Sequence, residues 1–600
     1  MRWFLRISIA ILLLGTVGFV AASSYLPLEL MKNHLHSPAP DLAKFLTVER
    51  LSEVRNHFRP TAAVLLFTAI ILFGYRREIP RLCEQLLLDR NRFWKTWTQE
   101  ISSYVRDPWT LWPFLAVILL GFVLRVLELF RPVRYDEAYT YLVFARHPLY
   151  VALSYYPAPN NHLFHTFLVF LSTHLLGNSL TALRLPALVG GLLMMPAVFA
   201  VTAAQYNRSA AIAATALVAC APPFIEYSVN ARGYTWQAVF LLLMACFACR
   251  IDRQEGARLD WVGLILAAAG AVYTIPTSVM PCACIILWLM LIRWRPGGSN
   301  GLVCVARQVT PVLLSILVLV MWLYLPPLIV SGPANILGNE FIQGMGPAKF
   351  LAEIPTLARM TWIRWNDGMP LAAQVFVCVG FVVGLVAHRK MGRQPVPLTP
   401  LVILCCVAFG VIRTAFGYSR VWLFLWLFFL ITAGAGMAFV LCRRWVVAVF
   451  AVVFAAVVGT AAHRQQVYLW STETGNVPDI AKAAAWIDQH LDSQDCIVTS
   501  TVAGYPLRYL LHQRWPKLEP QIDCGPAPRR IVAVIAKGPD VDDGHATDAK
   551  SWRLQEKPPS MTMFTRHDRS DYSEPRVVKD LVGVTIWEAW NVSVSVPDRE

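Results

Sequence analysis

Residues 111–130 read LWPFLAVILLGFVLRVLELF, and residues 131–140 continue as RPVRYDEAYT. The first stretch is almost entirely apolar and is long enough, as a helix, to cross the ~30 Å hydrocarbon core of a bilayer. The second stretch carries two adjacent acids, Asp136 and Glu137. Carboxylates directly beyond a membrane helix are costly near lipid and contribute little to packing, so this pattern indicates a functional site at the membrane boundary.

The composition of the whole chain is that of an integral membrane protein. Of its 600 residues, 56% are hydrophobic and only 15% are charged, whereas soluble domains carry about 25% charged residues. The net charge of +15 lies outside residues 464–600, because that stretch holds 16 Lys and Arg against 19 Asp and Glu. A positive excess in the membrane region is best explained by membrane topology and by contacts with anionic lipid headgroups. It argues against a nucleic-acid partner.

Apolar stretches alternate with basic loops along the chain. Counting Lys and Arg between the stretches predicts a polytopic α-helical protein of about 13 transmembrane helices, with the N-terminus inside and the C-terminus outside. The charge alternation holds only if the apolar segment His162–Leu176 lies along the outer interface instead of crossing. We expect the cytoplasmic (inner) membrane as the location. The expected spans are 6–25, 61–75, 111–130, 184–205, 209–227, 235–249, 261–275, 277–292, 309–330, 371–387, 400–414, 421–441 and 445–462.

Three domains are expected. Residues 1–108 form a two-span extension with a basic cytoplasmic loop, and residues 109–463 form the transmembrane catalytic domain, with outer loops at 131–183 and 331–370. Residues 464–600 alternate predicted helices with short apolar strands, which predicts an α/β domain in the periplasm or outside the cell. Its expected elements are a helix from Pro478, strands at 496–500, 531–536 and 582–587, and a helix at 505–512. An outer surface helix is expected at 347–360.

Three further motifs follow the double acid at a specific order and spacing. They are Asn160-Asn161-His162, the stretch 182–186 (ALRLP) and the stretch 227–234 (YSVNARGY). With the double acid, this set resembles the GT-C superfamily of polytopic glycosyltransferases, in particular the branch related to protein O-mannosyltransferases and the lipid A aminoarabinose transferase. The resemblance spans residues 109–462. It implies an inverting transfer of a sugar from a polyprenyl-phosphate donor to a lipid, glycan or protein acceptor at the outer face of the membrane.

The resemblance also assigns roles to residues. The first acid of the family's pair is the catalytic base, which here is Asp136, and Glu137 is either a second catalytic acid or a support of the loop through hydrogen bonds. Arg232 can form paired hydrogen bonds with the donor phosphate, and Gly233 lets the backbone approach closely. Arg420 and Arg413 flank a short outer turn and are candidates for the same role. Interfacial anchoring remains an alternative for all three arginines.

Further side chains are expected to line the substrate cavity: Arg134, Tyr139, Asn161, His162, His165, Arg184 and Tyr234. For the two histidines a simple interfacial role remains open. Relatives often carry an acid near position 230, but this chain has Asn230. We therefore predict no metal ligands and no cofactor, while a divalent cation, Mg²⁺ or Mn²⁺, stays open.

Two questions remain open from the sequence. A non-catalytic transporter or glycan-assembly partner is the alternative function, although transporters tend to show inverted repeats and charges at the membrane midplane, and here the charges cluster at one face. Among the 13 cysteines, Cys246 and Cys249 have metal-like spacing inside an apolar helix, which favours packing. Cys496 and Cys524 are able to pair if the tail lies outside the cytoplasm.

Overall fold

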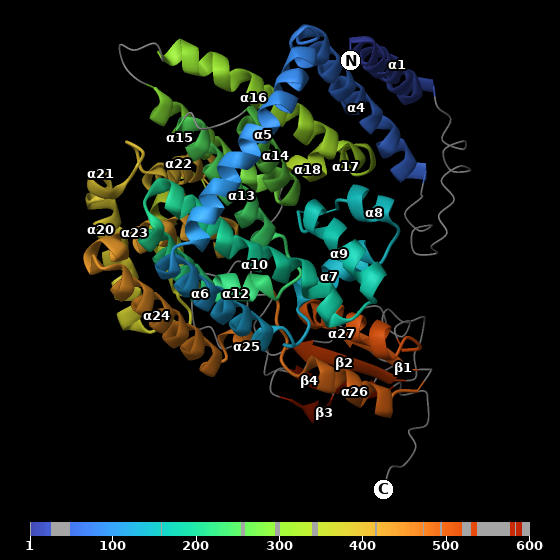
Figure 1. The fold of residues 1–600 in the computed structure, drawn as a ribbon. Coiled ribbons are helices and arrows are strands. Elements are labelled where there is room, and N and C mark those ends of the chain that lie inside the picture. Colours follow the sequence, from blue (N-terminus) through green and yellow to red (C-terminus); the bar gives the residue numbers. More distant parts are fainter. Residues whose placement is uncertain are drawn as a thin grey trace.

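The computed structural model describes most of the chain. The described residues are 2–25, 48–157, 159–253, 258–294, 301–338, 346–414, 417–471, 473–492, 495–518, 530–536, 576–581 and 584–590. They form a large helical body with a small sheet at one end (Figure 1). The predicted fold class, a polytopic helical membrane protein with a C-terminal α/β unit, is confirmed.

Nine helices in the described part of the chain are long and apolar enough to cross a membrane. A tenth span results if α11 and α12, which meet at a bend of 64°, cross together. The other three expected spans correspond to helices of 16 or 17 residues, so the predicted count of 13 is not confirmed. The helices of this body are α1 (Arg2–Tyr25), α4 (Val48–Gly74), α6 (Pro108–Glu128), α10 (Leu180–Gln205), α11 (Arg208–Cys220), α12 (Pro222–Ser228), α13 (Tyr234–Asp252), α14 (Arg258–Thr274), η2 (Pro276–Ser278), α15 (Val279–Arg293), α16 (Leu302–Leu323), α20 (Leu371–Val386), α22 (Leu398–Arg413), η3 (Ser419–Trp422), α23 (Leu423–Leu441) and α24 (Arg444–Arg464).

Shorter helices fill the connections between spans. The first outer loop folds into α7 (Tyr135–Tyr139), the π-helix η1 (Thr140–Ala145), α8 (Leu149–Ser154) and α9 (Leu163–Leu176). The surface helix expected at 347–360 is α19 (Pro347–Trp365). The basic loop after the second span contains a 28-residue helix that we did not predict, α5 (Glu78–Val105). The remaining short helices are α17 (Leu325–Val330), α18 (Gly332–Leu337), α21 (His388–Met391) and α25 (Val467–Trp470).

Small residues let the central helices pack closely. Ten of the thirteen residues of α11 are Ala, Ser, Thr, Cys or Val, and every residue from Ala210 to Cys220 is buried. A Cβ atom on Gly434 of α23 would lie 2.5 Å from the backbone nitrogen of Ala214. Because lipid tails give apolar helices little reason to associate, close backbone approach of this kind is what holds membrane helices together. It fixes the frame on which the outer loops are built.

The two ends of α6 have different surroundings. Asp107, at its start, lies near the guanidinium groups of Arg208 and Arg444, which begin α11 and α24. Glu128, at its end, contacts His463 at the end of α24, with 2.5 Å between Oε1 and Nδ1. Arg208 and Arg444 thus lie at one end of α6, and the double-acid loop follows the other end.

The sheet lies below the double-acid loop in the view of Figure 1. It contains β1 (Asp495–Thr499), β2 (Arg530–Ala536), β3 (Arg576–Asp580) and β4 (Val584–Trp590) in the order β1-β2-β4-β3, with β1 and β2 parallel and the other pairs antiparallel. Helices α26 (Ile480–His490) and α27 (Thr501–Arg514) match the predicted helices, whereas β3 was not predicted. Cys496 is disulfide-bonded, and its expected partner Cys524 lies outside the described residues.

Helix α27 joins the α/β unit to the double-acid loop. The ring of Tyr505 packs edge-on against Tyr139 and Tyr135 of α7, with centroid distances of 4.8 Å and 5.2 Å. The Tyr509 hydroxyl donates to the carbonyl of Asn178 at 2.9 Å. The α/β unit therefore covers the outer loop instead of being an independent appendage.

Candidate functional site

Glu137 is held by hydrogen bonds from three directions. Its Oε1 accepts from the backbone N–H of Arg134 at 2.8 Å, which fixes the first turn of α7. Its Oε2 accepts from Arg184 Nε at 2.9 Å and from the N–H of Ala231 at 3.3 Å, and Arg184 Nη2 forms a further ion pair with Oε1. Both side chains of the Glu137–Arg184 pair are fully buried. A carboxylate with this many partners has little capacity left to accept a proton from a substrate. This supports the alternative in which Glu137 stabilises the loop through hydrogen bonds.

Arg184 also closes the turn between α6 and α7. Its guanidinium donates to the carbonyls of Leu129, Arg131 and Pro132 at 2.6–2.8 Å. These carbonyls follow the end of α6, where backbone acceptors have no partner within the helix. Arg184 therefore acts as a buried cap that sets the direction of the loop.

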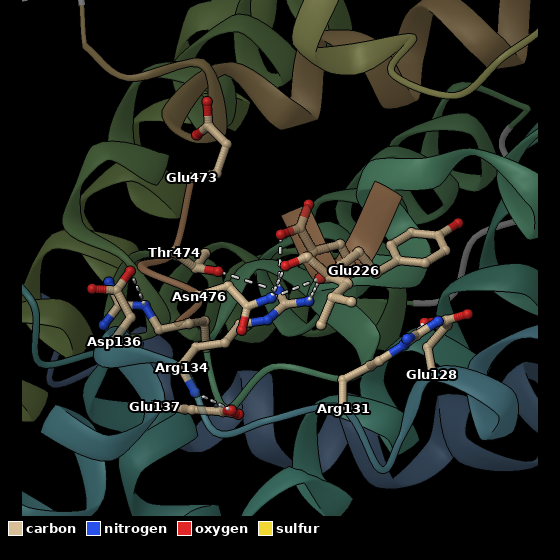
Figure 2. Close-up of polar contacts among 12 residues, drawn as sticks. Glu128, Arg131, Arg134, Asp136, Glu137, Glu226, Glu473, Thr474 and Asn476 are labelled. Atoms are coloured by element: carbon tan, nitrogen blue, oxygen red, sulfur yellow. Dashed lines mark hydrogen bonds and ion pairs between the residues drawn. The ribbon is translucent and has the colours of Figure 1, made fainter. Parts of the chain in front are cut away.

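Arg134 connects the loop to two distant segments. Its Nη1 lies 2.8 Å from Glu226 Oε1 on α12 and donates to the Thr474 hydroxyl at 3.2 Å, while Nη2 donates to the Tyr468 carbonyl at 3.1 Å. Figure 2 shows the guanidinium of Arg134 pointing toward Glu226 and Thr474, with the Asp136 carboxylate directed elsewhere. We name Arg134, Glu137, Arg184 and Glu226 the support cluster.

Asp136 has a different environment from its neighbour. It is 6% exposed, and its Oδ2 lies 3.6 Å from Arg420 Nη1 and 3.9 Å from Arg232 Nε. These separations are ion-pair distances, too long for good hydrogen bonds. Within the described residues, Oδ2 is buried and accepts no hydrogen bond, and Nε of Arg232 donates none. We name Asp136, Arg232 and Arg420 the charge cluster.

Neighbouring groups fix the orientation of Arg232. Its Nη1 donates to the Asn160 carbonyl at 2.8 Å. The N–H of Gly233 donates to His162 Nδ1 at 2.8 Å, which puts the imidazole proton on Nε2, 3.2 Å from Arg232 Nη2. Two N–H groups then face each other, so we do not count that contact as a hydrogen bond. A Cβ on Gly233 would lie 2.6 Å from Thr274 Cγ2, so this position requires glycine.

The histidines of this region are neutral. Burial and the nearby charge of Arg232 hold the pKa of His162 well below its usual range. Burial and Arg232 lower the pKa of His165 to about 3. The Tyr234 ring packs edge-on against His162, with 5.2 Å between centroids. Among the described residues, the positive charge beside Asp136 therefore comes from Arg232 and Arg420, because neither imidazole is protonated near neutral pH.

A segment that links α24 to the α/β unit forms one wall of the charge cluster. We call residues 465–479 the connecting segment. Three consecutive carbonyls in it accept hydrogen bonds: Glu473 from Arg420, Thr474 from the N–H of Asp136 at 3.4 Å, and Gly475 from the N–H of Tyr135 at 2.9 Å. Backbone carbonyls of the connecting segment thus hold both Arg420 and the turn that carries Asp136.

A small pocket lies beside Arg420. The Ser419 hydroxyl donates to Glu473 Oε1 at 2.6 Å, and Arg364 Nε lies 3.8 Å from the same oxygen. Glu473 Oε2 accepts no hydrogen bond in the described part of the chain. The pocket is lined by Pro223, Glu226, Tyr227, Arg364, Trp365, Ser419, Arg420, Leu423 and Glu473. Two carboxylates, two guanidinium groups and two aromatic rings thus surround one small pocket.

Comparisons with known proteins agree on the fold. Residues 158–325 match the family of dolichyl-phosphate-mannose-protein mannosyltransferases. Two solved structures of ArnT from Cupriavidus metallidurans, one in the apo state and one bound to undecaprenyl phosphate, each align over 81% of this chain and 98% of theirs, at 14% identity and a TM-score of 0.51. The chain has the GT-C fold.

An oligosaccharyltransferase from Archaeoglobus fulgidus, solved with a tethered acceptor peptide, aligns over 68% of this chain and 64% of its own at 14% identity, with a TM-score of 0.40. The sequence matches no curated protein. His162, Arg184 and Arg232 lie within the region that the mannosyltransferase family matches, whereas Asp136, Arg420 and Glu473 lie outside it.

The GT-C fold distributes the predicted site residues over three places. It brings Asp136, Arg232 and Arg420 together, with His162 and Tyr234 beside them. It puts Arg134, Glu137 and Arg184 into the support cluster. Asn161 belongs to the loop scaffold, because its amide donates to the carbonyls of Ala152 and Tyr155 at 3.0 Å each.

The other predicted residues lie at the edges. His165 is fully buried behind the charge cluster. Tyr139 packs under α27, and Arg413 is exposed at the end of α22. Sequence reasoning missed Glu473. Glu473 follows the end of the last span, α24, by a few residues, just as Asp136 follows the end of α6. This position directly beyond a span could have indicated Glu473 as a site residue.

No group of three or more His, Cys, Asp or Glu residues that could hold a metal ion occurs among the described residues. Asn230 is fully buried. The charge cluster contains one carboxylate and two guanidinium groups, a set that suits an anion.

Proposed function

We propose that this protein is an inverting glycosyltransferase that moves a sugar from a polyprenyl-phosphate donor to a hydroxyl group of a lipid, glycan or protein acceptor, at the outer face of the cytoplasmic membrane. The observation that carries the proposal is the charge cluster: a buried carboxylate oxygen without a hydrogen bond in the described part of the chain, between two guanidinium groups at 3.6 Å and 3.9 Å. The matched mannosyltransferase family and the bound lipid phosphate of one ArnT structure support the donor class.

In the proposed reaction, Arg232 and Arg420 bind the donor phosphate. A guanidinium group fits phosphate oxygens through parallel charge-assisted hydrogen bonds. Arg232 Nε has no hydrogen-bond acceptor among the described residues, so it is available for a ligand. When phosphate occupies both arginines, Asp136 loses its ion-pair partners and is free to accept a proton.

Asp136 then acts as the general base. It takes the proton from the acceptor hydroxyl as that oxygen attacks the anomeric carbon. The bond between this carbon and the phosphate oxygen breaks, and the leaving lipid phosphate carries its charge to the two arginines. Attack from the side opposite to the phosphate inverts the configuration at the anomeric carbon.

Glu137 takes a structural role in this proposal. Its four hydrogen bonds hold the turn that presents Asp136. A residue committed in this way keeps its neighbour within the narrow range of geometries that catalysis tolerates.

The decisive experiment compares cells that carry the gene, lack it, or carry Asp136→Asn. Mass spectrometry of the extracted lipids and surface glycans should show one sugar-bearing product lost, and one sugar-linked lipid accumulated, in both altered strains. An Asp488→Asn strain is the matched control, since Asp488 is exposed on α26. A protein that is made and inserted, with identical glycans and lipids in all four strains, would favour a non-catalytic membrane partner.

A further inference from the structure

Helix α5 lies between two candidate membrane spans. Span α4 ends at Gly74, α5 covers residues 78–105, and span α6 begins at Pro108. Both ends of α5 are therefore within a few residues of the membrane boundary. A helix of 28 residues is about 42 Å long, so α5 must run along the surface of the helical body.

One face of α5 is fixed to that body. Arg258 Nη1 of α14 lies 2.9 Å from Asp89 Oδ2. Arg250, near the end of α13, donates from Nη2 to the Thr96 hydroxyl at 2.8 Å and from Nη1 to Glu100 Oε2 at 3.4 Å. These contacts tie α5 to the side of the body opposite to the charge cluster, because α13 begins next to Arg232 and ends at α5.

The opposite face of α5 carries an exposed apolar stripe. Leu87, Trp94, Ile101 and Val105 are 69%, 60%, 53% and 52% exposed. Their spacing of seven, seven and four residues puts all four on one line along the helix. Large apolar side chains in such a row are costly to expose to water. We call these four residues the apolar stripe.

A basic stripe runs beside it. Arg81, Arg92, Lys95 and the C-cap residue Arg106 are all exposed and share a second side of the helix. Arg90 is exposed as well, so α5 and its C-cap residue carry five exposed cations. Two acids of the helix, Glu78 and Glu84, are exposed. Apolar and basic stripes side by side are typical of helices that lie in the plane of an anionic membrane surface.

We propose that α5 is a docking surface for anionic phospholipids of the leaflet opposite to the charge cluster. The apolar stripe inserts among the acyl chains, and the basic stripe binds the headgroup phosphates. The membrane is favoured over a protein partner as occupant because both ends of α5 continue directly into candidate spans, so the stripe cannot leave the boundary region. This surface is independent of the proposed transfer reaction.

Spin labels test the insertion. Full-length protein with Cys442, an exposed cysteine, replaced by serine is labelled at Trp94→Cys or at Lys95→Cys and reconstituted into vesicles of phosphatidylcholine and phosphatidylglycerol. The unaltered parent signal is subtracted. We expect the label at position 94 to collide mainly with oxygen, and the label at position 95 mainly with a water-soluble nickel chelate. Equal access of the nickel chelate to both labels would overturn the proposal. Shielding of both labels from oxygen and from the chelate would also overturn it, and would indicate that a protein covers α5 in place of lipid.

Charge removal tests the lipid class. The triple variant Arg81→Gln, Arg92→Gln and Lys95→Gln should retain phosphatidylglycerol less well in native mass spectrometry, on the order of tenfold or more, because each cation near an anionic surface adds severalfold to the affinity. The control Arg389→Gln, Lys390→Gln and Arg443→Gln removes the same charge from other exposed positions. Equal retention by both triple variants would contradict a specific role of α5, even if transfer activity is normal.

Discussion

Asp136 and Glu137 are neighbours in one turn of α7, but their carboxylates have opposite environments. Glu137 is fully buried and accepts hydrogen bonds from Arg184, Arg134 and Ala231. Asp136 lies between Arg232 and Arg420, and its Oδ2 makes no hydrogen bond within the described residues. Of these two adjacent acids, Glu137 therefore stabilises the loop, whereas Asp136 keeps an oxygen that is available for proton transfer.

The largest expected effect is on Asp136. Asp136→Asn keeps the shape of the side chain and removes its ability to accept a proton. We expect transfer to fall by about 10²–10⁴-fold, with a smaller loss of stability than for Glu137→Gln, because the ion pairs of Asp136 are long, at 3.6 Å and 3.9 Å. The measurement is the transfer rate of purified protein, with Asp488→Asn as the control that should keep full activity.

Glu137 should respond in stability. Glu137→Gln removes the charge that balances Arg184 in a fully buried pair, and breaking such a pair costs about 3–5 kcal/mol. We expect a lower melting temperature and a lower yield of folded protein, with near-normal transfer per folded molecule. Normal stability with lost transfer would instead make Glu137 the catalytic acid.

The arginines of the charge cluster should show smaller, graded effects. Arg232→Lys and Arg420→Lys each keep the charge but lose the paired hydrogen bonds. We expect the affinity for undecaprenyl phosphate to fall by about 10–100-fold for each, since a hydrogen bond to a charged group contributes about 1.5–3 kcal/mol. Arg413→Lys is the matched control, because Arg413 is exposed at the end of α22. If Arg413→Lys weakens binding as much, the phosphate site extends beyond the charge cluster.

The smallest expected effect is that of metal removal. Two guanidinium groups can neutralise a phosphate without a cation, and Asp136 is the one carboxylate that we place in the charge cluster. Activity should therefore survive excess chelator. Loss of transfer with chelator and its return with Mg²⁺ or Mn²⁺ would indicate that further acids, such as Glu473 and Glu226 of the nearby pocket, complete a cation site.

Local patterns in the sequence were sufficient for much of this site. The double acid beyond an apolar run, and an arginine before Gly233, could be found because each sits within a few residues of a helix end. Length and hydropathy also predicted the spans, although α14, α20 and α22 are too short to pass as spans on those criteria.

Long-range contacts could not be predicted in the same way. The Glu137–Arg184 pair joins residues 47 positions apart, and Arg134 meets Thr474 across 340 positions. Glu473 enters the site because the connecting segment folds back over α7, which no local pattern indicates. From the sequence, the basic residues of α5 were assigned to a cytoplasmic loop. The count of basic residues predicts on which side of the membrane a segment lies, but not whether that segment is helical.

The most direct test of the account measures two quantities on one variant, Asp136→Asn: the affinity for undecaprenyl phosphate and the rate of sugar transfer. Removing the negative charge leaves Arg232 and Arg420 without a competing anion, so we predict that the lipid phosphate binds at least as tightly as in the unaltered protein while transfer falls by about 10²–10⁴-fold. Transfer that continues at a near-normal rate, or a loss of transfer fully explained by weaker phosphate binding, would contradict the assignment of Asp136 as the base.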